Sequence, residues 1–99
     1  MRRQKPLVQF FAVEIGVKLY ELWADDEDFI LYEFVGEGVR IATWALEAKE
    51  IPTRQEVEDE MVRVFQKTMN FDYAPEQFSE IAEFIIARLE LFKVQQLAY

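Results

Sequence analysis

The chain has 99 residues, a formal net charge of −8 and a hydrophobic share of 52%. It contains neither Cys nor His, which excludes disulfides, thiolate chemistry, Cys-type zinc sites and the usual general base near neutral pH. The excess of carboxylates repels phosphates, so the composition argues against direct nucleic-acid binding and suits a basic partner or a solubilising role.

The length predicts one helical domain over residues 6–99, preceded by a basic flexible tail over residues 1–5 with Arg2, Arg3 and Lys5. The hydrophobic share exceeds the roughly 45–50% of ordinary domains, and a small domain has little interior in which to bury it. We therefore expect an oligomer, or a surface that docks on a larger protein.

The basic start and the apolar run at residues 7–17 superficially resemble a secretion signal. Glu14 interrupts that run, Lys18 and Glu21 follow it, and no small-residue cleavage site appears. The run is also too short and too charged to span a bilayer. The sequence therefore predicts a cytoplasmic protein that does not enter the membrane.

The first predicted helix covers residues 7–24. Its polar residues Glu14, Lys18 and Glu21, with Asp25 just beyond, are spaced i, i+4, i+7 and i+11, which is one narrow stripe on a helix. Almost every other position is apolar. Such a helix is expected to be embedded, either within the domain or at a subunit interface.

The second predicted helix covers residues 27–49, after an acidic turn at residues 25–28 whose aspartates suit helix capping better than metal binding. In a helix interior Gly36 and Gly38 each lower the stability of the helix by roughly 1 kcal/mol relative to Ala. Gly38 projects to the apolar side, so it either allows a close helix approach or marks a break in the helix.

A different interpretation of residues 11–44 stays open at this point. Apolar residues alternate over residues 11–19, as in a half-buried strand, and residues 29–35 and 39–44 flank a short Gly-Glu-Gly loop. This pattern would give an α+β fold, with a three-stranded antiparallel meander followed by two helices. The polar stripes favour the all-α fold, a compact four-helix domain.

The third predicted helix covers residues 54–69 and begins with the most specific local pattern in the chain. Thr53 and Glu56 form a capping box directly after Pro52. We expect Asp59 to pair with Arg63 at i, i+4. The predicted inward residues are Val57, Met61, Val64 and Phe65, and the predicted outward ones are Glu58, Asp59, Arg63, Gln66 and Lys67.

The fourth predicted helix covers residues 75–98 and begins at Pro75, after a loop whose Phe71 and Tyr73 are expected to pack on the core. Its predicted buried face comprises Phe78, Ile81, Ala82, Ile85, Leu89 and Phe92. Its predicted acidic face comprises Glu76, Glu80, Glu83 and Glu90. Phe84 and Leu91 lie off the buried face and require a second contact.

Four residues are candidates for binding a protein partner. Trp44 projects among charged positions, and Arg40 precedes it by four residues and could stack on its ring. Phe84 and Leu91 form the other candidate pair. The acidic face of the fourth helix is a separate candidate, suited to a basic groove.

No residue pattern predicts catalysis, a cofactor or a metal. Ser79, the only serine, has no His or nearby Lys to activate it, and the glutamates lie on predicted solvent faces. Gly16, Gly36 and Gly38 match no phosphate-binding motif. We expect a protein–protein interaction module rather than an enzyme; an acidic inhibitor or nucleic-acid mimic, related to phage or defence, is the alternative.

Residues 45–60, with the sequence ALEAKEIPTRQEVEDE, are followed by a long final helix. This helix–Pro-Thr–helix pattern resembles the helical middle of some phage tail-assembly chaperones. The resemblance covers about half of the chain and assigns no role to any single residue. It implies transient binding to aggregation-prone phage proteins.

Overall fold

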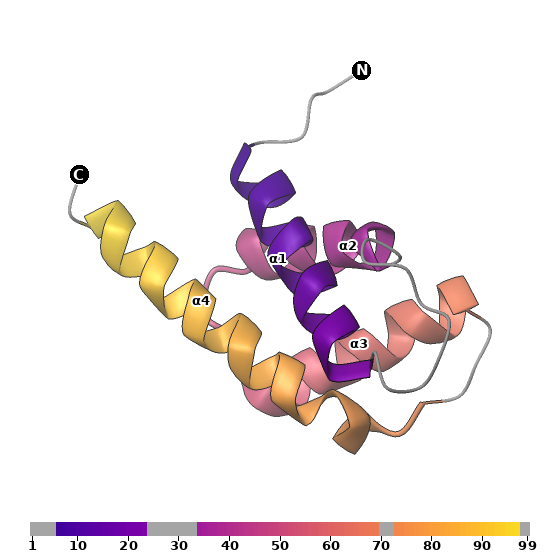
Figure 1. The fold of residues 1–99 in the computed structure, drawn as a ribbon. Coiled ribbons are helices and arrows are strands. Elements are labelled where there is room, and N and C mark those ends of the chain that lie inside the picture. Colours follow the sequence, from indigo (N-terminus) through magenta and orange to yellow (C-terminus); the bar gives the residue numbers. More distant parts are fainter. Residues whose placement is uncertain (1–5, 24–33, 70–72, 98–99) are drawn as a thin grey trace. The chain divides into compact units, whose positions relative to one another are not determined.

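The computed structural model describes residues 6–23, 34–69 and 73–97, and most of these residues lie in helices (Figure 1). The α-helices are α1 (Pro6–Trp23), α2 (Val35–Glu47), α3 (Arg54–Met69) and α4 (Ser79–Leu97), and a 3-10 turn, η2 (Pro75–Phe78), leads directly into α4. No strand occurs within these ranges. The all-α prediction with four helices is confirmed, and the meander is wrong, because residues 11–23 and 35–44 are helical.

The predicted boundaries hold closely for α1 and α3, and less well for the other two helices: the helix predicted from Pro75 starts as the 3-10 turn η2, and α4 begins only at Ser79. A turn at Phe34 precedes α2, whose first regular hydrogen bond joins the Gly38 amide to the Phe34 carbonyl at 2.8 Å. The helix therefore begins at Val35. Residues 27–33 of the predicted helix, the acidic turn at 25–28 and the basic tail at 1–5 lie outside the described residues.

The chain folds into two compact units, Met1–Trp44 and Ala45–Tyr99. In the first unit α1 and α2 approach closely at two glycines, and a side chain would have no room at Gly38 and little room at Gly16. A Cβ added at Gly38 would lie 2.4 Å from the Ala12 carbonyl oxygen, and one at Gly16 would lie 3.2 Å from a methyl group of Val35. The glycines thus permit the close approach that the sequence suggested for Gly38, without a break in α2.

In the second unit α3 packs against both η2 and α4. Every predicted inward residue of α3 and every predicted buried residue of α4 is buried, as the helical periodicity required. An aromatic cluster closes the end of this core: the ring centroids of Phe65, Tyr73 and Phe78 lie 5.3–5.6 Å apart. The prediction that Tyr73 packs on the core is confirmed, and Phe71 lies outside the described residues.

The start of α3 shows the predicted capping box. The Glu56 amide donates to Thr53 Oγ1 at 3.2 Å, and the Thr53 amide donates to Glu56 Oε1 at 2.9 Å. The two bonds satisfy backbone donors that the first turn of a helix otherwise leaves unpaired. They fix the point at which α3 begins, and therefore the positions of Arg54 and Glu58 in its first turns.

Candidate partner-binding face

The side of α4 that does not face the core carries both of the candidate features predicted for this helix. Glu80, Phe84, Ala87 and Leu91 are spaced i, i+4, i+7 and i+11, so they form one stripe along the helix. Glu83 and Glu90 are spaced by seven residues and form an acidic line beside that stripe, and Glu76 lies just before α4, in the turn η2. We call these seven residues the α4 outer face.

Leu91 is the most accessible apolar side chain of this face, with 44% of its surface exposed. Phe84 is half-buried, and the Arg88 guanidinium lies over its ring at 5.2 Å from the centroid. The four glutamates and Ala87 are exposed. The structure therefore places Phe84, Leu91 and the predicted acidic residues together on one surface, with Leu91 as the free apolar side chain.

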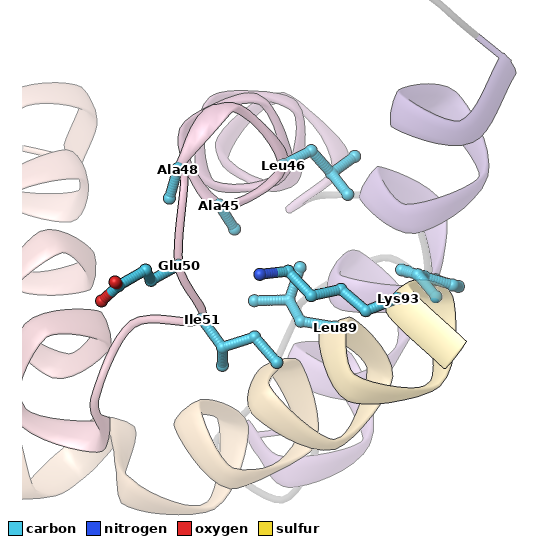
Figure 2. A pocket seen from close by; sticks show the side chains of 8 residues that line it. Ala45, Leu46, Ala48, Glu50, Ile51, Leu89 and Lys93 are labelled. Carbon is cyan, nitrogen blue, oxygen red and sulfur yellow. The ribbon is translucent and has the colours of Figure 1, made fainter. Parts of the chain in front are cut away.

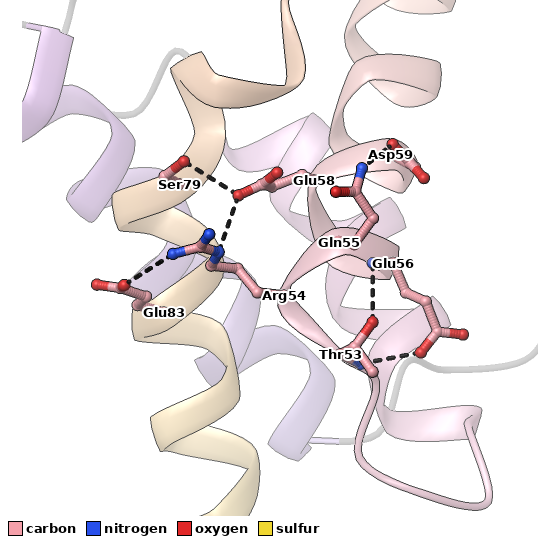
Figure 3. Close-up of polar contacts among 8 residues, drawn as sticks. All are labelled: Thr53, Arg54, Gln55, Glu56, Glu58, Asp59, Ser79 and Glu83. Carbon is pink, nitrogen blue, oxygen red and sulfur yellow. Dashed lines mark hydrogen bonds and ion pairs between the residues drawn. The ribbon is translucent and has the colours of Figure 1, made fainter.

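A polar cluster links the start of α3 to the start of α4 and holds this face in place (Figure 3). Arg54 lies between two carboxylates: its Nε is 3.3 Å from Glu58 Oε2, and one of its terminal nitrogens is 3.4 Å from Glu83 Oε1. Ser79 Oγ donates a hydrogen bond to Glu58 Oε2 at 3.0 Å. The single serine thus has a hydrogen-bond partner in the buried carboxylate of Glu58.

Two predictions for α3 are wrong. Glu58, predicted to face solvent, is buried, because Ser79 of α4 and Arg54 cover and pair its carboxylate. Arg63 pairs with Glu60 rather than with Asp59, and its Nε donates to Glu60 Oε1 at 3.1 Å. Asp59 instead accepts a hydrogen bond from Gln55 at 2.9 Å. The hydrogen bond and the negative charge of Glu60 raise the pKa of Arg63, because both stabilise the charged guanidinium.

The two carboxylates that share Arg54 are expected to respond very differently to truncation. The Glu58 side chain is 7% exposed and that of Glu83 is 66% exposed. Glu58→Ala should lower the free energy of unfolding by about 1–2 kcal/mol, because it leaves the Ser79 hydroxyl without its acceptor. Glu83→Ala, the matched control, should change it by less than about 0.5 kcal/mol. Urea unfolding of both variants measures the difference, and equal losses would contradict this account of the cluster.

The other predicted pair, Arg40 and Trp44, belongs to the first unit. Arg40 is exposed and Trp44 is half-buried. The predicted stacking of Arg40 on Trp44 is not among the contacts of the described residues; the cation–π contact found there is Arg88 over Phe84. The structure thus gives Trp44 no distinguishing feature as an anchor for a partner.

Sequence reasoning missed a second exposed apolar surface, on α1. Phe10 is 57% exposed and Val13 is 41% exposed, although α1 was predicted to be embedded on most sides. Val17 and Tyr20 continue the same line at i+7 and i+10 from Phe10, and both are half-buried. The predicted polar stripe is less exposed than expected, since Glu14 and Lys18 are also half-buried.

One small cavity opens at the other side of α4, within the second unit (Figure 2). Its volume is about 50 Å³, well below the roughly 300 Å³ at which small-molecule sites begin. Lys93 Nζ at its rim donates to the Lys49 carbonyl at 3.2 Å. It is lined by Ala45, Leu46, Ala48, Glu50, Ile51, Leu89, Phe92 and Lys93. A cavity of this size holds a few waters at most and no cofactor.

The described ranges contain no group of three or more carboxylates placed to hold a metal ion. Among the helices of these ranges, none combines the length and the apolar character that crossing a bilayer requires. Comparison of the chain with protein-family models, with curated proteins and with solved structures finds no match. The resemblance to tail-assembly chaperones therefore stays a prediction from the sequence alone.

Proposed function

We propose that this chain is a non-enzymatic protein–protein interaction module that acts through the α4 outer face, either by self-association or by docking on a larger partner. The observation that carries the proposal is the exposure of Leu91, a large apolar side chain beside half-buried Phe84. The other side of the same helix is already buried in the core of its unit. Single exposed apolar residues are ordinary. Here, however, the exposed residue continues a helical stripe with Phe84 and Ala87.

The chemistry of this face supports binding better than catalysis. Its four carboxylates are all solvent-exposed, and that of Glu83 also shares Arg54 with Glu58. Exposed carboxylates without a cleft lack the low-dielectric surroundings that tune acids and bases for catalysis. Leu91 still has 44% of its surface to bury, which corresponds to roughly 1 kcal/mol out of the roughly 1.5–3 kcal/mol that a completely exposed Leu side chain gains on burial.

The proposal is tested by comparing two variants that each replace one exposed apolar side chain with the helix-forming residue Gln. Sedimentation velocity and capture of partners from the native lysate are measured for the wild type, Leu91→Gln and Phe10→Gln. Loss of the complex in Leu91→Gln alone supports binding through α4. A complex that both variants retain, or the absence of any complex in the wild type, contradicts the proposal.

A second candidate, an acidic inhibitor or nucleic-acid mimic, is favoured by the exposed glutamates Glu76, Glu80 and Glu90. Such a protein would occupy a basic groove of a phage- or defence-related partner in the cytoplasm. Charge-driven binding weakens steeply with salt, whereas apolar docking does not. A complex that persists unchanged at about 1 M salt would exclude the mimic and keep the interaction module.

A further inference from the structure

We propose that the α4 outer face docks a single basic amphipathic helix from a different protein, in the side-by-side manner of a coiled coil. The inference rests on the proposed function and specifies the chemistry of the partner. Its basis is a juxtaposition on one helix: an apolar stripe and an acidic line run next to each other. From the sequence alone, the two features are separate candidates for different partners.

The apolar stripe has the spacing that helix pairing requires. Phe84, Ala87 and Leu91 are separated by three and then four residues, which is the spacing of the apolar seam in a coiled coil. The opposite side of α4 is already buried in the core of its own unit, as Ile85 and Leu89 show. The helix therefore has one covered face and one face with the periodicity of a second helix contact.

The charges along one side of the stripe point to a basic partner, while Arg88 on the other side lies over the Phe84 ring. Glu83 and Glu90 each directly precede a seam residue, and in coiled coils residues at such positions choose the partner by their charge. Glu76 lies in the 3-10 turn η2 ahead of α4, so it adds a further negative charge before this line without sharing its heptad register. Arg54 approaches Glu83 at 3.4 Å, while no ion pair is found for Glu76, Glu80 or Glu90 within the described ranges. Lys or Arg side chains at heptad spacing would complement these carboxylates.

The same charges disfavour a second copy of this chain as the occupant. In a parallel pair Glu83 could reach Arg88 of the other copy, but Glu80 would face its own counterpart within the seam. In an antiparallel pair the line of Glu83 and Glu90 would face the identical line of the other copy. Like charges placed opposite each other oppose association. A different chain with basic flanks avoids both conflicts.

The test uses a synthetic peptide of three identical heptads, with Leu at the seam positions, Lys at the flanking positions and a fluorescent label. A second peptide with Glu in place of every Lys is the control probe. We expect the Lys peptide to bind the full chain, with a dissociation constant that rises at least about tenfold between about 0.1 M and 1 M salt. The Glu peptide should not bind measurably. No binding of the Lys peptide contradicts the inference.

Matched variants separate docking on α4 from unspecific attraction to an acidic protein. The triple variant Glu76→Gln, Glu80→Gln, Glu90→Gln removes three charges from the α4 outer face. The triple variant Glu21→Gln, Glu47→Gln, Glu50→Gln removes three exposed charges elsewhere. The first should weaken binding of the Lys peptide at least about tenfold and the second less than about threefold. Equal losses would overturn the inference.

The apolar contribution is tested with Leu91→Gln, for which an approximately tenfold loss is expected, and with Phe10→Gln as the unaffected control. Circular dichroism of every variant confirms that its helices are intact. If the Lys peptide fails to bind while the protein forms a complex or oligomer that Leu91→Gln abolishes, the basic-helix inference fails and the interaction module stands. If Leu91→Gln affects no complex of any kind, both fail.

Discussion

Replacing Gly38 with Ala is expected to destabilise the first unit by about 2–3 kcal/mol. The added Cβ would lie 2.4 Å from the Ala12 carbonyl oxygen, and also 3.2 Å from the carbonyl carbon of the same residue. These are backbone atoms of α1, so no side-chain rotation can remove the clash. The two helices must separate, and the apolar contacts at their crossing are then lost. The midpoint of urea unfolding measures the effect.

Gly36→Ala is the matched control for this prediction, since both glycines lie in the first turns of α2. A Cβ at Gly36 would meet nothing within 4 Å. Ala has the higher helix propensity, so Gly36→Ala should stabilise by up to about 1 kcal/mol. The two substitutions are thus expected to have opposite signs. Stabilisation by both would show that α1 and α2 do not approach as closely as described.

Truncation of Phe78 to Ala should have the largest effect, a loss of about 3–5 kcal/mol in the free energy of unfolding. The Phe78 side chain is fully buried and packs between the rings of Phe65 and Tyr73, at centroid distances of 5.3 and 5.5 Å. Removing the ring leaves a cavity that the two remaining aromatic side chains cannot fill without leaving their own contacts. Such a loss is a large fraction of the stability of a small protein.

The control for the aromatic cluster is Phe10→Ala, which removes the same side chain from an exposed position on α1. Because Phe10 is 57% exposed, its truncation should cost less than about 1 kcal/mol. Thermal unfolding followed by circular dichroism reports both variants. A loss at Phe78 no larger than that at Phe10 would mean that the ring does not form part of a packed core.

The helices of the second unit could be predicted closely from the sequence, because local patterns alone determine them. The Thr53–Glu56 capping box fixed the start of α3, and the i, i+3 and i+4 spacing identified the buried residues of α4 from Phe78 to Phe92. The start of α2 could not be predicted in this way. No comparable cap precedes Val35, and the apolar residues before it suit a helix equally well.

Burial on α1 was hard to predict for a different reason. When nearly every position is apolar, periodicity does not tell which side faces the core, so Phe10 and Val13 could not be separated from Phe11 and Ile15. The burial of Glu58 was also unpredictable, because Ser79, which lies 21 residues further along the chain, supplies its hydrogen bond. Tertiary pairing of this kind leaves no trace in the helical pattern of α3.

The central claim is that the α4 outer face is the surface through which this chain binds a basic helix. The most direct measurement is an NMR titration of the isotope-labelled full chain with the Lys peptide, followed through the backbone amides. The account predicts that the largest shifts cluster on α4 between Glu80 and Leu91, with little change along the exposed side of α1. Shifts centred on Phe10 and Val13, or spread evenly over the acidic residues, would contradict it.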